Sequence, residues 1–103
     1  MRKILWSDSV IDDFDYNIEF LISKWTILEA QEFVDEVNRV IKILEIGNVD
    51  FPEINYKNIR GANICRQINL LYRINTNGGV ELIRFWDTRQ NPDKLKDFLK
   101  SRY

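Results

Sequence analysis

The hydrophobic pattern of this 103-residue chain changes its period once, near the middle. Over residues 7–47 apolar side chains recur every three or four positions, which is typical of helices with one buried face. Over residues 67–86 they alternate with polar ones, which is typical of strands covered on one side. A chain of this length forms one hydrophobic core. We therefore predict a single domain, residues 1–103, in which helices pack on a small sheet.

Two amphipathic helices are predicted in the first half. The first begins at Ser7 or Ser9, whose hydroxyl can cap it. The second begins at Thr26, which forms a capping box with Glu29, and ends near Gly47. So short a connection makes the pair an antiparallel hairpin with one apolar face. The predicted core positions are Ile11, Phe14, Ile18, Leu21, Ile22 and Trp25, then Ala30, Phe33, Val34, Val37, Val40, Ile41 and Leu44.

A short strand, residues 2–7, precedes the helices, and a three-strand meander follows them. The meander strands are predicted at residues 56–63, 67–75 and 80–86, and the residues at 64–66 and 75–79 form the two turns. In the second of these strands Ile68, Leu70, Tyr72 and Ile74 share one face. In the last strand, one face carries Ile83 and Phe85, and the other carries Leu82, Arg84 and Trp86.

A final helix is predicted at residues 93–100, because Asn91 followed by Pro92 is a good helix start. Leu95, Phe98 and Leu99 form its apolar side. The fold class is therefore α+β. We predict a small, mainly antiparallel sheet, made of the N-terminal strand and the meander, with the helical hairpin on one face and a short C-terminal helix.

The composition excludes several kinds of site. The chain has one cysteine, Cys65, and no histidine, which excludes an internal disulfide, cysteine-based metal clusters and histidine-dependent triads. Apolar runs reach three residues, far below the roughly 20 of a membrane helix. We expect a cytoplasmic protein with no membrane association, no metal and no organic cofactor, in which Cys65 is a packing residue.

Charge is distributed unevenly between the two halves. Residues 1–50 carry five basic and eleven acidic residues, a net charge of −6, whereas residues 51–103 carry ten basic and five acidic residues, a net charge of +5. The basic surface therefore belongs to the sheet half. Such asymmetry is typical of a partner-binding face, and a solvated mixed surface is the alternative explanation.

The order of elements, together with residues 68–75 (INLLYRIN) and 82–92 (LIRFWDTRQNP), resembles the RelE/ParE superfamily of toxins, the plasmid stabilisation proteins. The resemblance covers nearly the whole chain. It implies a bacterial toxin neutralised by a cognate antitoxin, encoded by an adjacent gene, in a toxin–antitoxin hetero-oligomer. The target that it implies is either DNA gyrase or the ribosome and its mRNA.

RNA cleavage in this superfamily needs cations that stabilise the charged transition state. By parity Arg60, Arg73 and Arg84 are expected on the sheet face opposite the helices. Trp86 is expected on that same open face, where a large ring favours a protein partner. Asp87 is expected to orient Arg89. The candidate catalytic residues are Arg60, Arg73, Arg84 and Arg89; the candidate antitoxin-binding residues are Lys57, Arg60, Arg73, Arg84, Trp86 and Arg89.

The resemblance to the nuclease branch is incomplete. Of its five characteristic positions, Arg60 and Arg89 match, whereas Ala62, Asn69 and Leu95 replace a lysine, an arginine and a tyrosine. The sequence pI of about 5.4 also disfavours RNA binding. We therefore predict a ParE-like or otherwise non-nucleolytic growth inhibitor. The alternatives are a RelE-like ribosome-dependent mRNA endoribonuclease and a non-toxic protein-binding module of the same fold.

Overall fold

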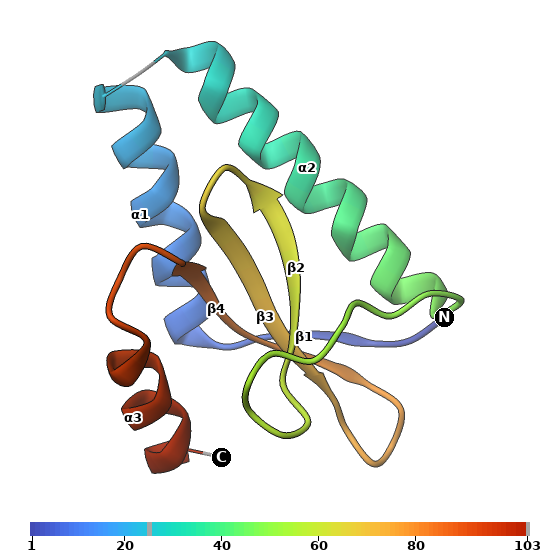
Figure 1. Cartoon of the computed structure of the whole chain (residues 1–103). Helices are drawn as coiled ribbons and strands as arrows, with labels where there is room; N and C mark the ends of the chain where they lie inside the picture. The colour runs from blue at the N-terminus through green and yellow to red at the C-terminus, as the bar shows by residue number, and fades with distance from the viewer. Residues whose placement is uncertain (25, 103) are drawn as a thin grey trace.

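The elements follow one another in the predicted order in the computed structural model, which describes residues 1–24 and 26–102 (Figure 1). The predicted core position Trp25 lies outside the described residues. Within the described part of the chain, no helix is both long enough and apolar enough to cross a membrane. The elements are β1 (Ile4–Trp6), α1 (Asp8–Lys24), α2 (Ile27–Ile46), β2 (Arg60–Cys65), β3 (Ile68–Ile74), β4 (Val80–Asp87) and α3 (Pro92–Arg102).

The four strands form one sheet in the order β1-β4-β3-β2. The pairs β2–β3 and β3–β4 are antiparallel, and β1 runs parallel to β4 with Ile4 opposite Val80. The predicted turn between β3 and β4 is closed by the Asn75 N–H, which donates to the Gly79 carbonyl at 2.8 Å, and Gly78 supplies a φ of 86°. The predicted α+β fold with a mainly antiparallel sheet is confirmed.

Ser7, Thr26 and Gly47 cap the helical hairpin at the predicted ends, whereas the Glu29 side chain pairs with Arg66 and does not complete the predicted capping box. The Ser7 hydroxyl accepts from the Val10 N–H at 3.2 Å, and the Thr26 hydroxyl accepts from the Glu29 N–H at 3.1 Å. Gly47 ends α2 with a φ of 79°. Between these caps, α1 packs against β4, and α2 packs against β2 and β1.

The main core lies between this hairpin and the sheet. Phe14, Phe33 and Phe85 meet with ring centroids 5.7–5.8 Å apart. One expectation for α1 is wrong: Val10 is fully buried, whereas Ile11 and Ile22 are 42% and 50% exposed. The helix is turned so that Val10 and Phe14, one helical turn apart, face the sheet. Other buried members are Leu21, Ala30, Val37, Val40, Leu44, Ala62, Ile64, Ile68, Leu70, Tyr72, Val80 and Leu82.

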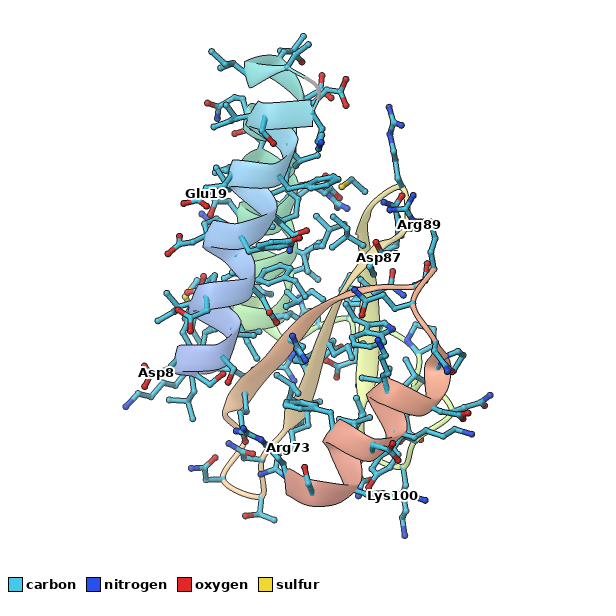
Figure 2. All side chains as sticks on the ribbon, turned by 90° about the vertical axis from the view of Figure 1, so that its left-hand side faces the viewer. Asp8, Glu19, Arg73, Asp87, Arg89 and Lys100 are labelled. Atoms are coloured by element: carbon cyan, nitrogen blue, oxygen red, sulfur yellow. The ribbon has the colours of Figure 1, made fainter. Side chains whose placement is uncertain are left out.

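The opposite sheet face, expected to be open, is partly covered by α3. Figure 2 shows the helical hairpin on one side of the sheet and α3 on the other. Asn91 caps this helix by accepting from the Asp93 N–H at 2.9 Å, as predicted. Its Leu99 forms a second buried cluster with Ile59, Leu71, Ile83 and Trp86.

A β-bulge in β4 explains why the predicted faces of this strand are wrong. Leu71 pairs with Arg84, and the next residue, Tyr72, pairs with Leu82, so Ile83 is an extra residue on β4. The insertion shifts the alternation of side chains. Leu82 and Phe85 therefore lie in the hairpin core, and Ile83 and Trp86 lie under α3.

The strand predicted at residues 56–63 is also displaced. The chain turns at residues 54–59 instead, where the Ile54 N–H donates to the Ile59 carbonyl at 2.9 Å and Asn58 has a φ of 67°. The strand β2 then runs from Arg60 to Cys65, and the turn into β3 is at Arg66, with a φ of 41°. Asparagine tolerates this left-handed conformation, which explains the early turn.

Candidate functional site

The structure divides the predicted arginine set between two hollows. Arg60 and Arg73 line a hollow beside the β3–β4 turn, whereas Arg84 and Arg89 line a cleft between α1 and the far end of the sheet. Arg60 pairs with Tyr72, which lies in the hairpin core, whereas Arg84 pairs with Leu71, which lies under α3. Paired residues of neighbouring strands point to the same side of a sheet, so Arg60 and Arg84 begin on opposite faces. The expectation that three guanidinium groups share one open face is therefore wrong.

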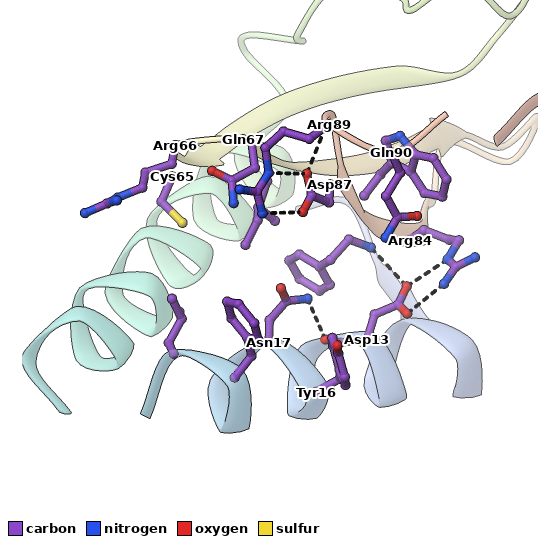
Figure 3. A pocket seen from close by; sticks show the side chains of 15 residues that line it. Asp13, Tyr16, Asn17, Cys65, Arg66, Gln67, Arg84, Asp87, Arg89 and Gln90 are labelled. Atoms are coloured by element: carbon purple, nitrogen blue, oxygen red, sulfur yellow. Dashed lines mark hydrogen bonds and ion pairs between the residues drawn. The ribbon is translucent and has the colours of Figure 1, made fainter. Parts of the chain in front are cut away.

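The cleft has a cavity volume of about 180 Å³ and is shown in Figure 3. Side chains of α1 form one wall, and the β2–β3 turn and the end of β4 form the other. Several lining residues, such as Tyr16, Asn17, Arg66 and Gln67, were not singled out from the sequence. Only the folded topology places the β2–β3 turn beside α1. The polar lining consists of Asp13, Tyr16, Asn17, Arg66, Gln67, Arg84, Asp87, Arg89 and Gln90.

Arg84 is held at the edge of this cleft by Asp13 of α1. Its Nε and Nη2 donate to the two carboxylate oxygens, each at 3.0 Å, and the Phe85 N–H donates to the same carboxylate at 3.2 Å. The strand β1 pairs with residues 80–82 of β4, so Asp13 occupies the strand edge beyond that point. The Arg84 guanidinium also lies 4.9 Å from the ring centroid of Phe98 in α3. Arg84 thus connects α1, β4 and α3.

Asp87 orients Arg89 as predicted. The Asp87 carboxylate accepts from the Arg89 N–H at 2.8 Å and from the Arg89 Nη2 at 3.1 Å. Hydrogen bonding to Arg89 holds the pKa of the Asp87 carboxyl below its usual range. The Arg89 side chain is 68% exposed at the mouth of the cleft, so its charge is largely solvated and already paired.

In the second hollow the two arginines also have partners. The Arg60 Nη1 donates to the Phe51 carbonyl at 2.8 Å, and the Arg73 Nε lies 2.9 Å from a Glu81 carboxylate oxygen. Glu53 lines the same hollow and adds a second carboxylate. Lys57, the remaining basic candidate, is exposed in the turn before β2. The hollow therefore has compensated charge and is not strongly cationic.

Trp86 and Cys65 occupy packing positions. Trp86 is 7% exposed beneath α3, so the expectation of an open-face position is wrong, and its contact with a partner stays a prediction. Burial raises the pKa of the Cys65 thiol, which favours its protonated form. Among the residues that the structure describes, no three His, Cys, Asp or Glu side chains are grouped to hold a metal ion.

No protein-family model and no curated protein matches this sequence, but solved structures match its fold. A chain of the chromosomal ParDE toxin–antitoxin system from P. aeruginosa overlays with a TM-score of 0.68 at 14% identity, covering 82% of this chain and 94% of that one. The YoeB/ParE toxin from Agrobacterium tumefaciens overlays with a TM-score of 0.58 at 17% identity, covering 81% and 94%. A chain of the YoeB–YefM complex from Staphylococcus aureus gives 0.55 at 13% identity, covering 82% and 94%.

This chain shares the fold of these toxin–antitoxin structures. Within the fold, the three positions that depart from the nuclease pattern serve as structural residues. Ala62 is fully buried in the hairpin core, Asn69 accepts a hydrogen bond from Asn63 at 3.1 Å, and Leu95 packs on the cluster beneath α3. None of these three side chains carries an ionisable group.

Proposed function

We propose that this chain is the toxin of a bacterial toxin–antitoxin pair, and that it arrests growth without cutting RNA, in the manner of ParE-like gyrase inhibitors. The RelE/ParE toxin fold supports the first part of the proposal. Two similar structures come from a ParDE toxin–antitoxin system and a YoeB–YefM complex. By analogy, the chain acts in the cytoplasm and is neutralised there by a cognate antitoxin in a hetero-oligomer.

The distribution of the arginines carries the second part. A nuclease needs cations that meet on one phosphate as negative charge develops in the transition state. Arg60 and Arg89, which match the nuclease pattern, line different hollows. Arg84 already gives two N–H groups to Asp13, and Arg89 is bound to Asp87. Separated and paired cations are poorly suited to transition-state stabilisation, and the chain has no histidine to act as a base.

The mRNA endoribonuclease is the second candidate, and the cleft beside α1 favours it. Arg66, Arg84 and Arg89 all line this cleft, and the 67% exposed ring of Tyr16 offers a surface for base stacking. Arg66 is 61% exposed, and a Glu29 oxygen lies 3.6 Å from its Nη2. A phosphate of an RNA substrate would therefore displace Glu29 from Arg66 more readily than Asp13 from Arg84.

The two candidates are separated by expressing the chain alone from a tightly repressed promoter. We expect growth arrest, induction of the DNA-damage response and no new mRNA 5′ ends within translated codons. In vitro, the purified chain should inhibit supercoiling by gyrase. New cuts that Arg89→Ala abolishes would establish the nuclease instead.

A matched control is Arg39→Ala on α2, which also removes an arginine–carboxylate pair, that with Glu36, but lies on the outer face of the hairpin. It should leave the arrest unchanged. Unimpeded growth with the folded protein present would overturn the toxin proposal and indicate the non-toxic binding module.

A further inference from the structure

A groove runs between α3 and the turn that precedes β2. It has a cavity volume of about 240 Å³. Its floor is apolar: Leu71 and Trp86 come from the sheet, and Leu95 and Leu99 come from α3. The rim includes Thr88 and other polar side chains, and one of these, Lys96, is a cation. Neither of the two functions considered above uses this groove.

The surface around the groove has a charge opposite to that of the hairpin. The helix α1 carries five acidic residues and one lysine, a net charge of −4, and α2 carries five acidic and two basic residues, a net charge of −3. The helix α3 carries four basic and two acidic residues, a net charge of +2. Figure 2 shows Asp8 and Glu19 on α1, on the far side of the sheet from Lys100 on α3. An acidic partner is therefore repelled by the hairpin and attracted to the α3 side.

We propose that this groove binds an acidic protein segment, which inserts one bulky apolar side chain between α3 and the sheet while its carboxylates meet Lys96 and the other cations of α3. The segment belongs to the antitoxin, so this inference rests on the proposed function. An apolar floor with a charged rim is the usual form of a site for an anchoring side chain. A nucleic acid is a poorer fit, because its affinity comes from several phosphate contacts, and the groove lining includes one cation.

The first test is an NMR titration of the full chain with the peptide acetyl-Glu-Glu-Leu-Phe-Glu-Glu-amide. We expect shifts concentrated at Leu71, Trp86 and Leu99. Lys96→Glu should weaken binding at least fivefold. The matched control Lys42→Glu places the same charge reversal on the exposed surface of α2 and should leave the affinity within twofold. Equal affinity for the Lys-Lys-Leu-Phe-Lys-Lys peptide would overturn the charge argument.

A steric variant tests the groove itself. Thr88 is exposed at the rim, so Thr88→Phe should fold normally and block the groove, whereas Thr88→Ser should bind like the parent. Shifts confined to the hairpin, or shifts at the groove that depend only on the concentration of the chain itself, would overturn the inference. Growth arrest by the chain alone, with no peptide binding, would refute the groove and leave the toxin proposal standing. Groove binding without growth arrest would refute the toxin proposal instead.

Discussion

The two faces of the sheet are covered by helices to different extents. On one face, helices of 17 and 20 residues cover a core in which Phe14, Phe33 and Phe85 touch one another. On the other face, one 11-residue helix packs its buried Leu99 on four other buried residues and leaves a groove along its side. Stability therefore comes mainly from the hairpin face, which leaves the α3 face freer to adapt to a partner.

Arg84 is the side chain that connects these two faces. Its guanidinium pairs with Asp13 of α1 and also lies against Phe98 of α3. A change in the position of α3 is therefore transmitted to the hairpin through Arg84. The predictions below test how unequal the two faces are and how far this connection couples them.

The largest effect is expected for Phe33→Ala on the hairpin face. Phe33 is 1% exposed and packs against Phe14 and Phe85. Removing its ring should lower the free energy of unfolding by about 3–5 kcal/mol. Urea denaturation followed by circular dichroism measures the change. A loss below that of the next variant would contradict the ranking of the two faces.

A smaller effect is expected for Leu99→Ala on the α3 face. Leu99 is fully buried, but it belongs to the last helix, which can shift to fill part of the cavity. We expect a loss of about 2–3 kcal/mol, at the low end for buried leucines. Native-state hydrogen exchange should show α3 amides opening before those of α2. Simultaneous opening of both helices would show that the faces form one cooperative unit.

The connection between the faces is tested by Asp13→Asn. The change removes the charge that holds Arg84 and weakens the acceptor of the Phe85 N–H, while it keeps the shape of the side chain. We expect a loss of about 1–2 kcal/mol. Exchange of α3 amides should also become faster, because Arg84 is then released from one side. Asp12→Asn, at an exposed position of the same helix, is the control and should change neither quantity.

The smallest effect on stability near neutral pH is expected for the ionisation of Tyr72. Burial raises the pKa of its phenol, and its oxygen accepts from the Phe51 N–H at 2.8 Å. Because the unfolded phenol ionises at about pH 10 and the folded one at higher pH, this contribution to stability is complete below about pH 10. It is lost as the pH rises through the folded pKa. Phenolate absorbance against denaturant should show this loss, and Tyr72→Phe should remove it. An unchanged pH dependence in that variant would assign the alkaline loss to another group.

Local chemistry made much of the fold predictable. Thr26 caps α2, Asn91 precedes α3, and Gly78 supplies the positive φ of the β3–β4 turn, each through groups only a few residues away. Such signals are readable because both partners lie in the same short stretch of sequence. The order and type of the elements followed from them and from the change in period.

Features that depend on distant partners could not be predicted. The bulge at Ile83 changes which side chains face the hairpin, and a regular alternation pattern gives no sign of it. Arg84 finds Asp13 across 71 positions, so its pairing is invisible in the sequence. The same holds for the cleft, because only the folded topology brings Arg66 beside α1. The sequence therefore identified basic residues of interest but not how they are grouped.

The parallel pair of β1 and β4 has a consequence for how the chain is made. Ile4 at the beginning pairs with Val80, and everything between them must be synthesised before that pair can form. At about 5–20 residues per second, translation of the intervening segment takes roughly 4–15 s. Contacts this distant along the chain also form slowly, since a long loop must close. On the ribosome the hairpin core stays incomplete during this interval, because the third phenylalanine of its cluster, Phe85, is itself on the last strand to be made.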